Sequence, residues 1–297
     1  MAERYSSIFR ADLFAGSVVF ITGGGTGIGR CTAHELAALG AMVVIGGRRQ
    51  EVLAKTAAEI VNNGGNCDTV EINIRDEQAV DTAIAQIIER HGKIDGLFNN
   101  AGGQFVGPLA DMSANGWKTV VDLNLNGTFL VSHAVYRHHM QAHGGAIVNM
   151  LADIQTGYPG MAHMSAARAG IENLSKTLAL EWAPSDVRIN CVAPGTILSN
   201  GMLTYPLEVQ KTSANIMRNS PAGRPGTESE VSAAVAFLLS PAATYIRGAT
   251  LSIDGGEGFQ KHQRLLPFSH PAGIGAYQGF HLTTDFSDTP FAELAPD

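Results

Sequence analysis

The chain has little cysteine, and the cysteines that it does have lie far apart. Cys31, Cys67 and Cys191 stand among 297 residues, outside any spacing typical of a metal site or a redox-active pair. This spacing excludes a disulfide framework and a structural zinc module. A sparse, odd set of cysteines is typical of reduced core thiols, so we expect a cytoplasmic protein without a bound metal.

Long apolar runs and clustered positive charge are also missing. No run of 18 apolar residues could span a bilayer, and Glu3, Arg4, Arg10 and Asp12 interrupt any signal-peptide core. The formal net charge of −7 is spread along the chain, without a basic stripe. We therefore expect neither nucleic acid nor a membrane as a partner. The last three residues, 295–297, are not a peroxisomal address.

Glycine and apolar residues, in contrast, are plentiful. The 34 glycines fall in short clusters between apolar runs, as the turns of an α/β protein require. Short, nearly continuous apolar runs predict seven strands: Val18–Thr22, Met42–Ile45, Thr69–Ile72, Gly96–Phe98, Ala146–Leu151, Val187–Val192 and Thr250–Ile253. Helical periodicity falls between them, at about 28–39, 50–63, 77–91, 114–142, 163–183 and 228–240.

This alternation predicts a single α/β domain of the Rossmann type, with a doubly wound, seven-stranded parallel sheet over residues 1–256. Two segments depart from the rhythm. Residues 196–226 form a long excursion between a strand and a helix, which we interpret as a loop that covers a substrate. Residues 257–297, rich in Pro, Phe, His and Gly, are expected to be an irregular C-terminal extension of the same domain.

A glycine-rich motif, TGGGTGIG, follows the first predicted strand and opens the first helix. Gly23 would make the tight turn, Gly27 would let the backbone approach a pyrophosphate, and Gly29 would let the helix pack on the strand. The N-terminus of the helix would then face the phosphates with unpaired N–H groups. Because the motif lies between a strand and a helix near the start of the chain, it predicts a dinucleotide site.

The second strand ends in Gly47, Arg48 and Arg49, where an NAD-preferring site carries a carboxylate for the ribose 2′-hydroxyl. A guanidinium can instead bind a 2′-phosphate through two hydrogen bonds. The pair therefore favours NADPH and NADP+ as cofactors. The alternative interpretation is that two solvated arginines merely begin a helix.

Four motifs in this order resemble the short-chain dehydrogenase/reductases: TGGGTGIG (22–29), NNAG (99–102), the segment VDLNLNG and VAPG (192–195). The resemblance runs from about residue 16 to residue 256 and implies that Asn124 is the helix-kinking asparagine of a catalytic tetrad. It also implies a set of cofactor contacts: Gly23, Thr26, Gly27, Ile28, Gly29, Arg48, Arg49, Asn73, Ile74, Asn99, Ala101, Gly102, Arg168, Pro194, Gly195, Thr196 and Ile197.

The other members of that tetrad are absent. Alignment with the Tyr-x-x-x-Lys helix of the family places Met164 at the tyrosine and Arg168 at the lysine, and thirteen residues earlier Leu151 stands at the serine. Methionine exchanges no proton, and arginine keeps its charge but does not pass protons near neutral pH. Alcohol oxidation in its usual form is therefore disfavoured, because it needs a base for the hydroxyl proton.

Within this family, NNAGGQF (99–105) and SAARAG (165–170) are similar to the peroxisomal trans-2-enoyl-CoA reductases, which also carry arginine at the lysine position. Related bacterial proteins resemble citronellol/citronellal dehydrogenases, and the 2,4-dienoyl-CoA reductases share the GGQF-like stretch. The resemblance implies reduction of an enoyl thioester. Donors such as backbone N–H groups, Arg168 or an ordered water near Asn124 would meet the enolate charge, and Asp153, or a water that it holds, would supply the proton. Asp153 could instead cap a turn, and Arg168 could be an anchor without a chemical role.

Two further function classes stay open. One is an alcohol or terpenoid dehydrogenase with an altered proton relay, and the other is a cofactor-binding, non-catalytic subunit that pairs with an active paralogue. The 196–226 excursion is apolar, which suits an acyl-CoA or another apolar substrate, and its apolar members are Met202, Leu203, Tyr205, Pro206, Ile216 and Met217. The segment 157–161 would form the opposite wall.

Four histidines, His133, His138, His139 and His143, gather on the predicted long helix. His139 and His143 have the spacing of a metal pair but lack a third ligand, so we expect no metal site. In the family this helix commonly lies in a subunit interface. The resemblance therefore implies a homo-oligomer, either a dimer or a tetramer.

Overall fold

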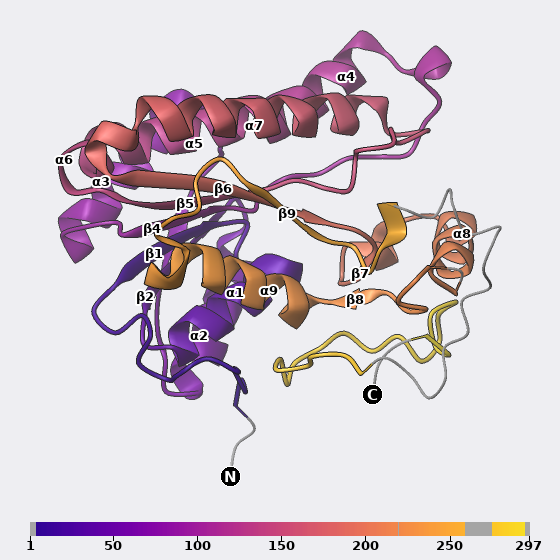
Figure 1. Ribbon diagram of the computed structural model, residues 1–297, viewed down its shortest axis with the longest axis horizontal. Helices are drawn as coiled ribbons and strands as arrows, with labels where there is room; N and C mark the ends of the chain where they lie inside the picture. The colour runs from indigo at the N-terminus through magenta and orange to yellow at the C-terminus, as the bar shows by residue number, and fades with distance from the viewer. Residues whose placement is uncertain (1–3, 219, 259–274, 295–297) are drawn as a thin grey trace.

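The computed structural model describes residues 4–218, 220–258 and 275–294. Its centre is a seven-stranded sheet in the order β3-β2-β1-β4-β5-β6-β9, with every neighbouring pair parallel (Figure 1). The strands are β1 (Val18–Thr22), β2 (Met42–Gly47), β3 (Asn66–Glu71), β4 (Gly96–Asn99), β5 (Gly145–Met150), β6 (Val187–Pro194) and β9 (Thr250–Ile253). All seven predicted strands and the doubly wound parallel sheet are confirmed. β3 begins three residues before the predicted start.

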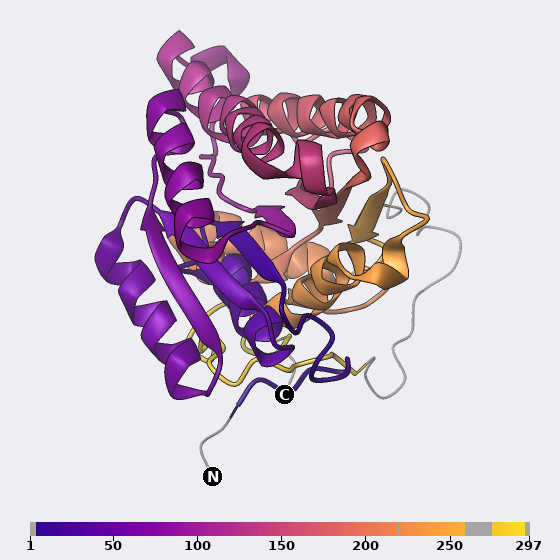
Figure 2. The same ribbon diagram turned by 90° about the vertical axis from the view of Figure 1, so that its left-hand side faces the viewer.

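Helices cover both faces of the sheet (Figures 1 and 2). The helices α1 (Gly27–Ala38), α2 (Gln50–Asn62) and α9 (Glu228–Leu239) lie on one face; α3 (Glu77–His91), α4 (Ala114–Val121), α5 (Gly127–Val135) and α7 (Ala162–Glu181) lie on the other. The alternation of side chains along β1 explains why both cores form. Val19 and Ile21 enter the core beneath α1 and α9, whereas Val18 and Phe20 enter the core beneath α3 and α5.

The order of the strands fixes where a ligand can bind. The chain runs from β1 outward to β2 and β3, and then returns to add β4 on the other side of β1. The carboxyl ends of β1 and β4 therefore begin loops that leave in opposite directions, which opens a crevice at this switch point. The glycine motif lies in the loop after β1, and NNAG begins at the end of β4.

The predicted helix over 114–142 contains two wider turns. Between α4 and α5 the segment Asp122–Asn126 is π-helical, and Tyr136–Met140 is π-helical before the short helix α6 (Gln141–His143). Inside the first π segment the Asn124 side-chain Nδ2 donates to the Val120 carbonyl at 2.8 Å. A side chain that donates to a carbonyl one turn back competes with the backbone hydrogen bonds of the helix. Such competition fits a π-helical turn, and these turns are frequent at functional sites.

The excursion over 196–226 is more ordered than a covering loop. It contains a two-stranded sheet of β7 (Ile197–Leu198) and β8 (Gly226–Thr227), a short 3₁₀ turn at Met202–Thr204, and the helix α8 (Leu207–Arg218). The interpretation of this segment as a plain loop was therefore wrong. The helix forms because Gln210, Ala214 and Met217 recur on its buried face.

The described part of the C-terminal segment, residues 275–294, contains no helix or strand and runs beside the N-terminal segment (Figures 1 and 2). The Ser6 amide donates to the Gly279 carbonyl at 2.9 Å. Further along, Phe286 and Phe291 form a cluster with Leu198 and Ala214. The segment thus supports β7 and α8 from below. Among the described residues no helix is long and apolar enough to cross a membrane.

Candidate functional site

The glycine loop turns tightly between β1 and α1 because its neighbours leave no room for side chains. A Cβ at Gly29 would lie 2.5 Å from the Gly23 carbonyl oxygen, so α1 can pack against the turn only with glycine there. Gly27 has a positive φ of 57°, and a Cβ at this position would meet nothing closer than 3.9 Å. The backbone of Gly27 is therefore open toward a ligand.

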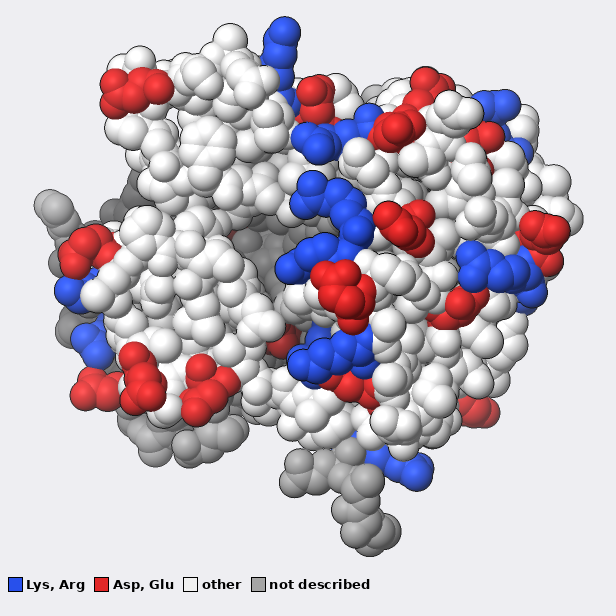
Figure 3. Space-filling model, turned by 180° about the vertical axis from the view of Figure 1, so that it is seen from behind, with Lys and Arg blue, Asp and Glu red and all other residues white. Residues whose placement is uncertain are grey.

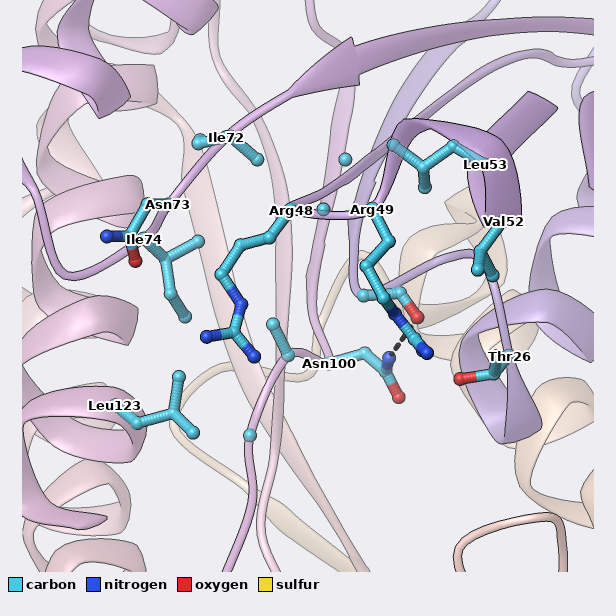
Figure 4. A pocket seen from close by; sticks show the side chains of 16 residues that line it. Thr26, Arg48, Arg49, Val52, Leu53, Ile72, Asn73, Ile74, Asn100 and Leu123 are labelled. Carbon is cyan, nitrogen blue, oxygen red and sulfur yellow. Dashed lines mark hydrogen bonds between the residues drawn. The ribbon is translucent and has the colours of Figure 1, made fainter. Parts of the chain in front are cut away.

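A cavity of about 260 Å³ lies beside this loop. Arg48 and Arg49 come from the end of β2 and point into it (Figure 4). Among the described residues, no carboxylate lies within salt-bridge distance of either guanidinium, and each is free to meet an anion. Seen from behind, the molecule has a deep hollow with Lys and Arg side chains gathered along one rim (Figure 3).

The other cofactor positions expected at this cavity divide into two groups. Asn73, Ile74, Ala101 and Gly102 line it. Asn99 lines neither this cavity nor the next one, because its Nδ2 points into the interior and donates to Ser132 Oγ and Asn149 Oδ1, each at 2.8 Å. The Asn99 side chain thus lies in the interior behind the cavity, where its hydrogen bonds support the end of β4.

The neighbouring asparagine, Asn100, was missed by sequence reasoning although it stands in the same motif. It lines both cavities. Its Nδ2 donates to the Thr22 carbonyl at 3.0 Å and to the Gly23 carbonyl at 3.1 Å, so it holds the glycine turn in place. The repeated Asn in NNAG was the available signal, but only the geometry distinguishes the two residues.

A second cavity, of about 440 Å³, begins where the first one ends. Thr26, Asn100 and Gly102 line both, so the two form one continuous site. The predicted residues Gly27, Ile28, Pro194, Gly195, Thr196 and Ile197 all line this second cavity.

Arg168 lines this cavity, and Asn124, which lines neither cavity, lies with it against the same side of Gly102. A Cβ at Gly102 would lie 2.5 Å from Arg168 Nη2 and 2.7 Å from Asn124 Oδ1. Arg168 donates through Nη1 to the Met150 carbonyl, and burial lowers its pKa to about 10. Its Nε and Asn124 Oδ1 are buried without a hydrogen-bond partner among the described residues. Buried polar groups are rarely left so, which marks this part of the cavity as a place for a polar ligand.

Three carboxylates, Asp153, Asp254 and Glu257, lie close together, and Asp153 and Glu257 line this cavity. A Cβ at Gly258 would lie 3.2 Å from Asp153 Oδ2 and 3.2 Å from Asp254 Oδ2. Glu257 accepts from the Thr196 amide at 3.0 Å. Burial raises the pKa of Asp153, and the nearby Asp254 adds to the effect; burial likewise raises the pKa of Glu257. Sequence reasoning found Asp153 but missed Glu257, which comes from the end of β9, a hundred residues away in the chain.

Part of the lining of this cavity is apolar. Leu151 and Met164 line the cavity, together with Tyr158 and Met161 from the predicted opposite wall. Of the apolar residues expected in the 196–226 segment, only Met202 and Tyr205 line it. Met217 lies on the buried face of α8, whereas the side chains of Leu203 and Ile216 are partly exposed.

The four histidines do not form a metal centre. The rings of His139 and His143 stack with centroids 4.4 Å apart, and His138 Nε2 lies 2.7 Å from Asp81 Oδ1. Across the residues that the structure describes, no group of three His, Cys, Asp or Glu side chains could hold a metal ion.

The chain is similar to known oxidoreductases over most of its length. A family model described as enoyl-(acyl carrier protein) reductase matches residues 23–257. A probable 2,4-dienoyl-CoA reductase of Bacillus subtilis is 39% identical over 242 residues, which are 80% of this chain and 95% of the relative. A peroxisomal 2,4-dienoyl-CoA reductase of Danio rerio is 35% identical over 258 residues, covering 86% of this chain and 85% of the relative.

Among solved structures, the citronellol catabolism dehydrogenase of Pseudomonas aeruginosa is 50% identical with a TM-score of 0.78, over 86% of this chain and 100% of that one. The chain therefore belongs to the short-chain dehydrogenase/reductase family, as its motifs predicted, and it is an oxidoreductase. Membership of this family implies a nicotinamide cofactor. The family model ends at residue 257, before the C-terminal segment.

Proposed function

We propose that the protein is an NADPH-dependent reductase of α,β-unsaturated acyl thioesters. The observation that carries this proposal is the lining of the second cavity, where Arg168 lies beside Gly102 with Asn124 behind it, while Met164 and Leu151 form part of the wall. This arrangement offers donors for an oxygen anion but no phenol or amine at those wall positions to take a proton from an alcohol.

The residues of the first cavity fit an NADP(H) molecule. The open backbone at Gly27 and the N-terminus of α1 suit the pyrophosphate, and the two unpaired guanidiniums of Arg48 and Arg49 suit a 2′-phosphate. Thr196 and Ile197 would flank the nicotinamide in the second cavity. When bound, the cofactor supplies a hydride to the β-carbon of the substrate.

Residues of the protein would then stabilise the negative charge on the thioester oxygen and supply a proton to the α-carbon. As negative charge grows on the thioester oxygen, Arg168 would stabilise it, with Asn124 fixing the backbone of Gly103 through a 2.8 Å hydrogen bond from Nδ2 to its carbonyl. Asp153, whose pKa burial raises above its usual value, would deliver a proton, directly or through water, to the α-carbon.

A second candidate is the oxidation of a terpenoid alcohol such as citronellol. The 50% identity to a citronellol catabolism dehydrogenase over the whole of that chain favours it. This reaction needs a base for the hydroxyl proton, and among the described residues that line this cavity the carboxylates of Asp153 and Glu257 could accept it. The same cofactor site would serve both reactions.

The location and assembly of the protein are also proposals. Three free thiols suit a reducing compartment, so we place the protein in the cytoplasm. We propose a homo-oligomer, and the apolar side chains of Phe129 on α5 and Leu251 on β9, each about two-fifths exposed, are candidates for contacts between subunits. Light scattering of the purified protein would report the number of subunits.

The decisive experiment follows NADPH oxidation with trans-2-octenoyl-CoA and NADP+ reduction with citronellol, in parallel assays. The proposal expects turnover of the thioester, and turnover of citronellol alone would favour the second candidate. If NADPH binds but neither substrate reacts, the protein is better explained as a cofactor-binding subunit of an active paralogue. Repeating each assay with NADH tests the preference for the 2′-phosphate.

A further inference from the structure

The segment 196–226 contributes a tyrosine to the same part of the cavity lining as Met164. Tyr205 lies between the 3₁₀ turn Met202–Thr204 and α8, and it lines the cavity. Its ring packs in the same apolar cluster as Met161 and Met164. A phenol therefore reaches this wall from the 196–226 segment, although none is present on α7 at position 164.

The oxygen of the Tyr205 phenol accepts a hydrogen bond, while its proton is not donated to any of the described residues. Gln104 Nε2 donates to Tyr205 Oη at 2.6 Å. A hydroxyl that accepts one hydrogen bond still carries a proton of its own to donate. No other hydrogen bond to this hydroxyl occurs in the part of the chain that the structure describes, so the proton is available to a ligand in the cavity.

The Tyr205 phenol and the Arg168 guanidinium both contact one short stretch of the chain. Gln104 follows Gly103, whose carbonyl accepts from Asn124, and Arg168 and Asn124 lie against the same side of Gly102. The segment 102–104 thus connects the proposed oxygen site at Arg168 to the hydroxyl of Tyr205. The charge of Arg168 also acts on this phenol and opposes the effect of burial on its pKa.

The backbone of Tyr205 is fixed as well. Its carbonyl accepts from the Gln210 side chain at 2.9 Å, and its amide donates to the Met202 carbonyl at 3.3 Å. Gln210 is itself buried beneath α8. A donor fixed before the substrate arrives needs little reorganisation when charge develops, which is the condition for strong stabilisation of an oxygen anion.

We propose that the Tyr205 hydroxyl, held by Gln104, donates a hydrogen bond to the carbonyl oxygen of the bound substrate and strengthens it as that oxygen becomes negative. The inference rests on the proposed function and adds a residue that contacts the reacting oxygen. Burial raises the pKa of Tyr205, so the phenol stays protonated at neutral pH. It is therefore a donor that suits reduction of a carbonyl-conjugated double bond, and it is poorly suited to act as a base.

The test compares Tyr205→Phe with Tyr245→Phe, a control at a fully exposed tyrosine far from the cavity. The first readout is the infrared carbonyl band of octanoyl-CoA, labelled with carbon-13 at the thioester and bound in the presence of NADP+. We expect a lower frequency with wild type and Tyr245→Phe than with Tyr205→Phe. An identical band in all three proteins overturns the proposal, whether or not the protein reduces enoyl thioesters.

The second readout is turnover of trans-2-octenoyl-CoA. Loss of one donor to an oxygen anion typically lowers kcat about a hundredfold, so we expect this loss in Tyr205→Phe, with KM and the Kd of NADPH unchanged. An unchanged kcat overturns the role of Tyr205. If wild type reduces no thioester, the proposed function fails separately, and the band of bound citronellal then decides the hydrogen bond. Binding of neither carbonyl compound overturns both proposals.

Discussion

Glu228 offers a prediction whose size follows from its surroundings. It is the first residue of α9 and is 5% exposed, at the edge of a cavity closed by the C-terminal segment. In the described part of the chain, no group donates a hydrogen bond to its carboxylate. Burial raises its pKa from 4.5 to about 7, although the positive charge of Arg30 opposes the shift.

The sign of the effect on stability follows from this raised pKa. Between pH 4.5 and pH 7 the folded protein keeps a proton on Glu228 that the unfolded chain has lost, so the free energy of unfolding falls as pH rises. The difference between 4.5 and about 7 corresponds to about 3 kcal/mol, reached above pH 7 and absent below pH 4.5. Other acids of raised pKa titrate in this range too, so only a comparison of variants isolates Glu228.

The perturbation is Glu228→Gln, which keeps the shape and removes the charge. We expect the variant to be more stable than wild type by about 2 kcal/mol at pH 8, after subtraction of up to about 1 kcal/mol for the lost attraction to the N-terminus of α9. At pH 4.5 the advantage should vanish. Urea unfolding followed by circular dichroism at both pH values measures the difference.

A matched control is Glu208→Gln, because Glu208 also lies in the first turn of a helix but its side chain is 82% exposed. We expect this variant to differ from wild type by less than about 0.5 kcal/mol at either pH. If Glu228→Gln is no more stable than wild type at pH 8, or if the gain is equal at both pH values, the carboxylate is not the strained group that its burial indicates.

Three further predictions concern the cofactor site, the proton donor and the C-terminal segment. In the double variant Arg48→Ala/Arg49→Ala, the Kd of NADPH should rise about a hundredfold while that of NADH changes little, since two charged hydrogen-bonding groups are lost; fluorescence titration measures both, and equal weakening would refute a 2′-phosphate contact. In Asp153→Asn, kcat for trans-2-octenoyl-CoA should fall at least a hundredfold with KM unchanged, because an amide cannot donate the carbon-bound proton; an unchanged kcat would remove Asp153 as the acid. In Phe291→Ala, a fully buried ring beneath α8 is lost, so urea unfolding should show about 3–5 kcal/mol of destabilisation, and a loss below about 1 kcal/mol would mean that the segment does not support α8.

The sequence was sufficient for those parts of the molecule that depend on local pattern. Seven apolar runs predicted seven strands, because strands covered on both faces need apolar residues at nearly every position. The places of the glycines in the first turn and of the arginines at the end of β2 were also predictable, because each follows a predicted strand directly. Asn124 was found through a family motif, and its hydrogen bonds to Val120 and Gly103 explain the π-helical turn around it.

Other parts depend on contacts between distant segments, and the sequence could not supply them. Glu257 reaches the site only because β9 lies beside β6, and the two asparagines of NNAG separate only when β4 turns one side chain inward. The helix α8 had a usable signal in the spacing of Gln210, Ala214 and Met217. That signal was weak, because one of its three buried residues is polar and the surrounding segment is rich in Gly and Pro.

The replacement of an α7 tyrosine by methionine has a consequence for how the site is assembled. Arg168 and Asn124 belong to α7 and to the π-helical turn, which pack on the sheet, whereas Tyr205 belongs to the segment that closes the cavity. If Arg168 and Tyr205 both donate to the oxygen of the substrate, the two donors come together only when the segment 196–226 is folded over the cavity. That position depends in turn on Phe286 and Phe291, which lie beyond the end of the family model. We therefore predict that the C-terminal segment holds Tyr205 in place through this cluster, and that loosening it lowers kcat for the thioester before it weakens the binding of NADPH.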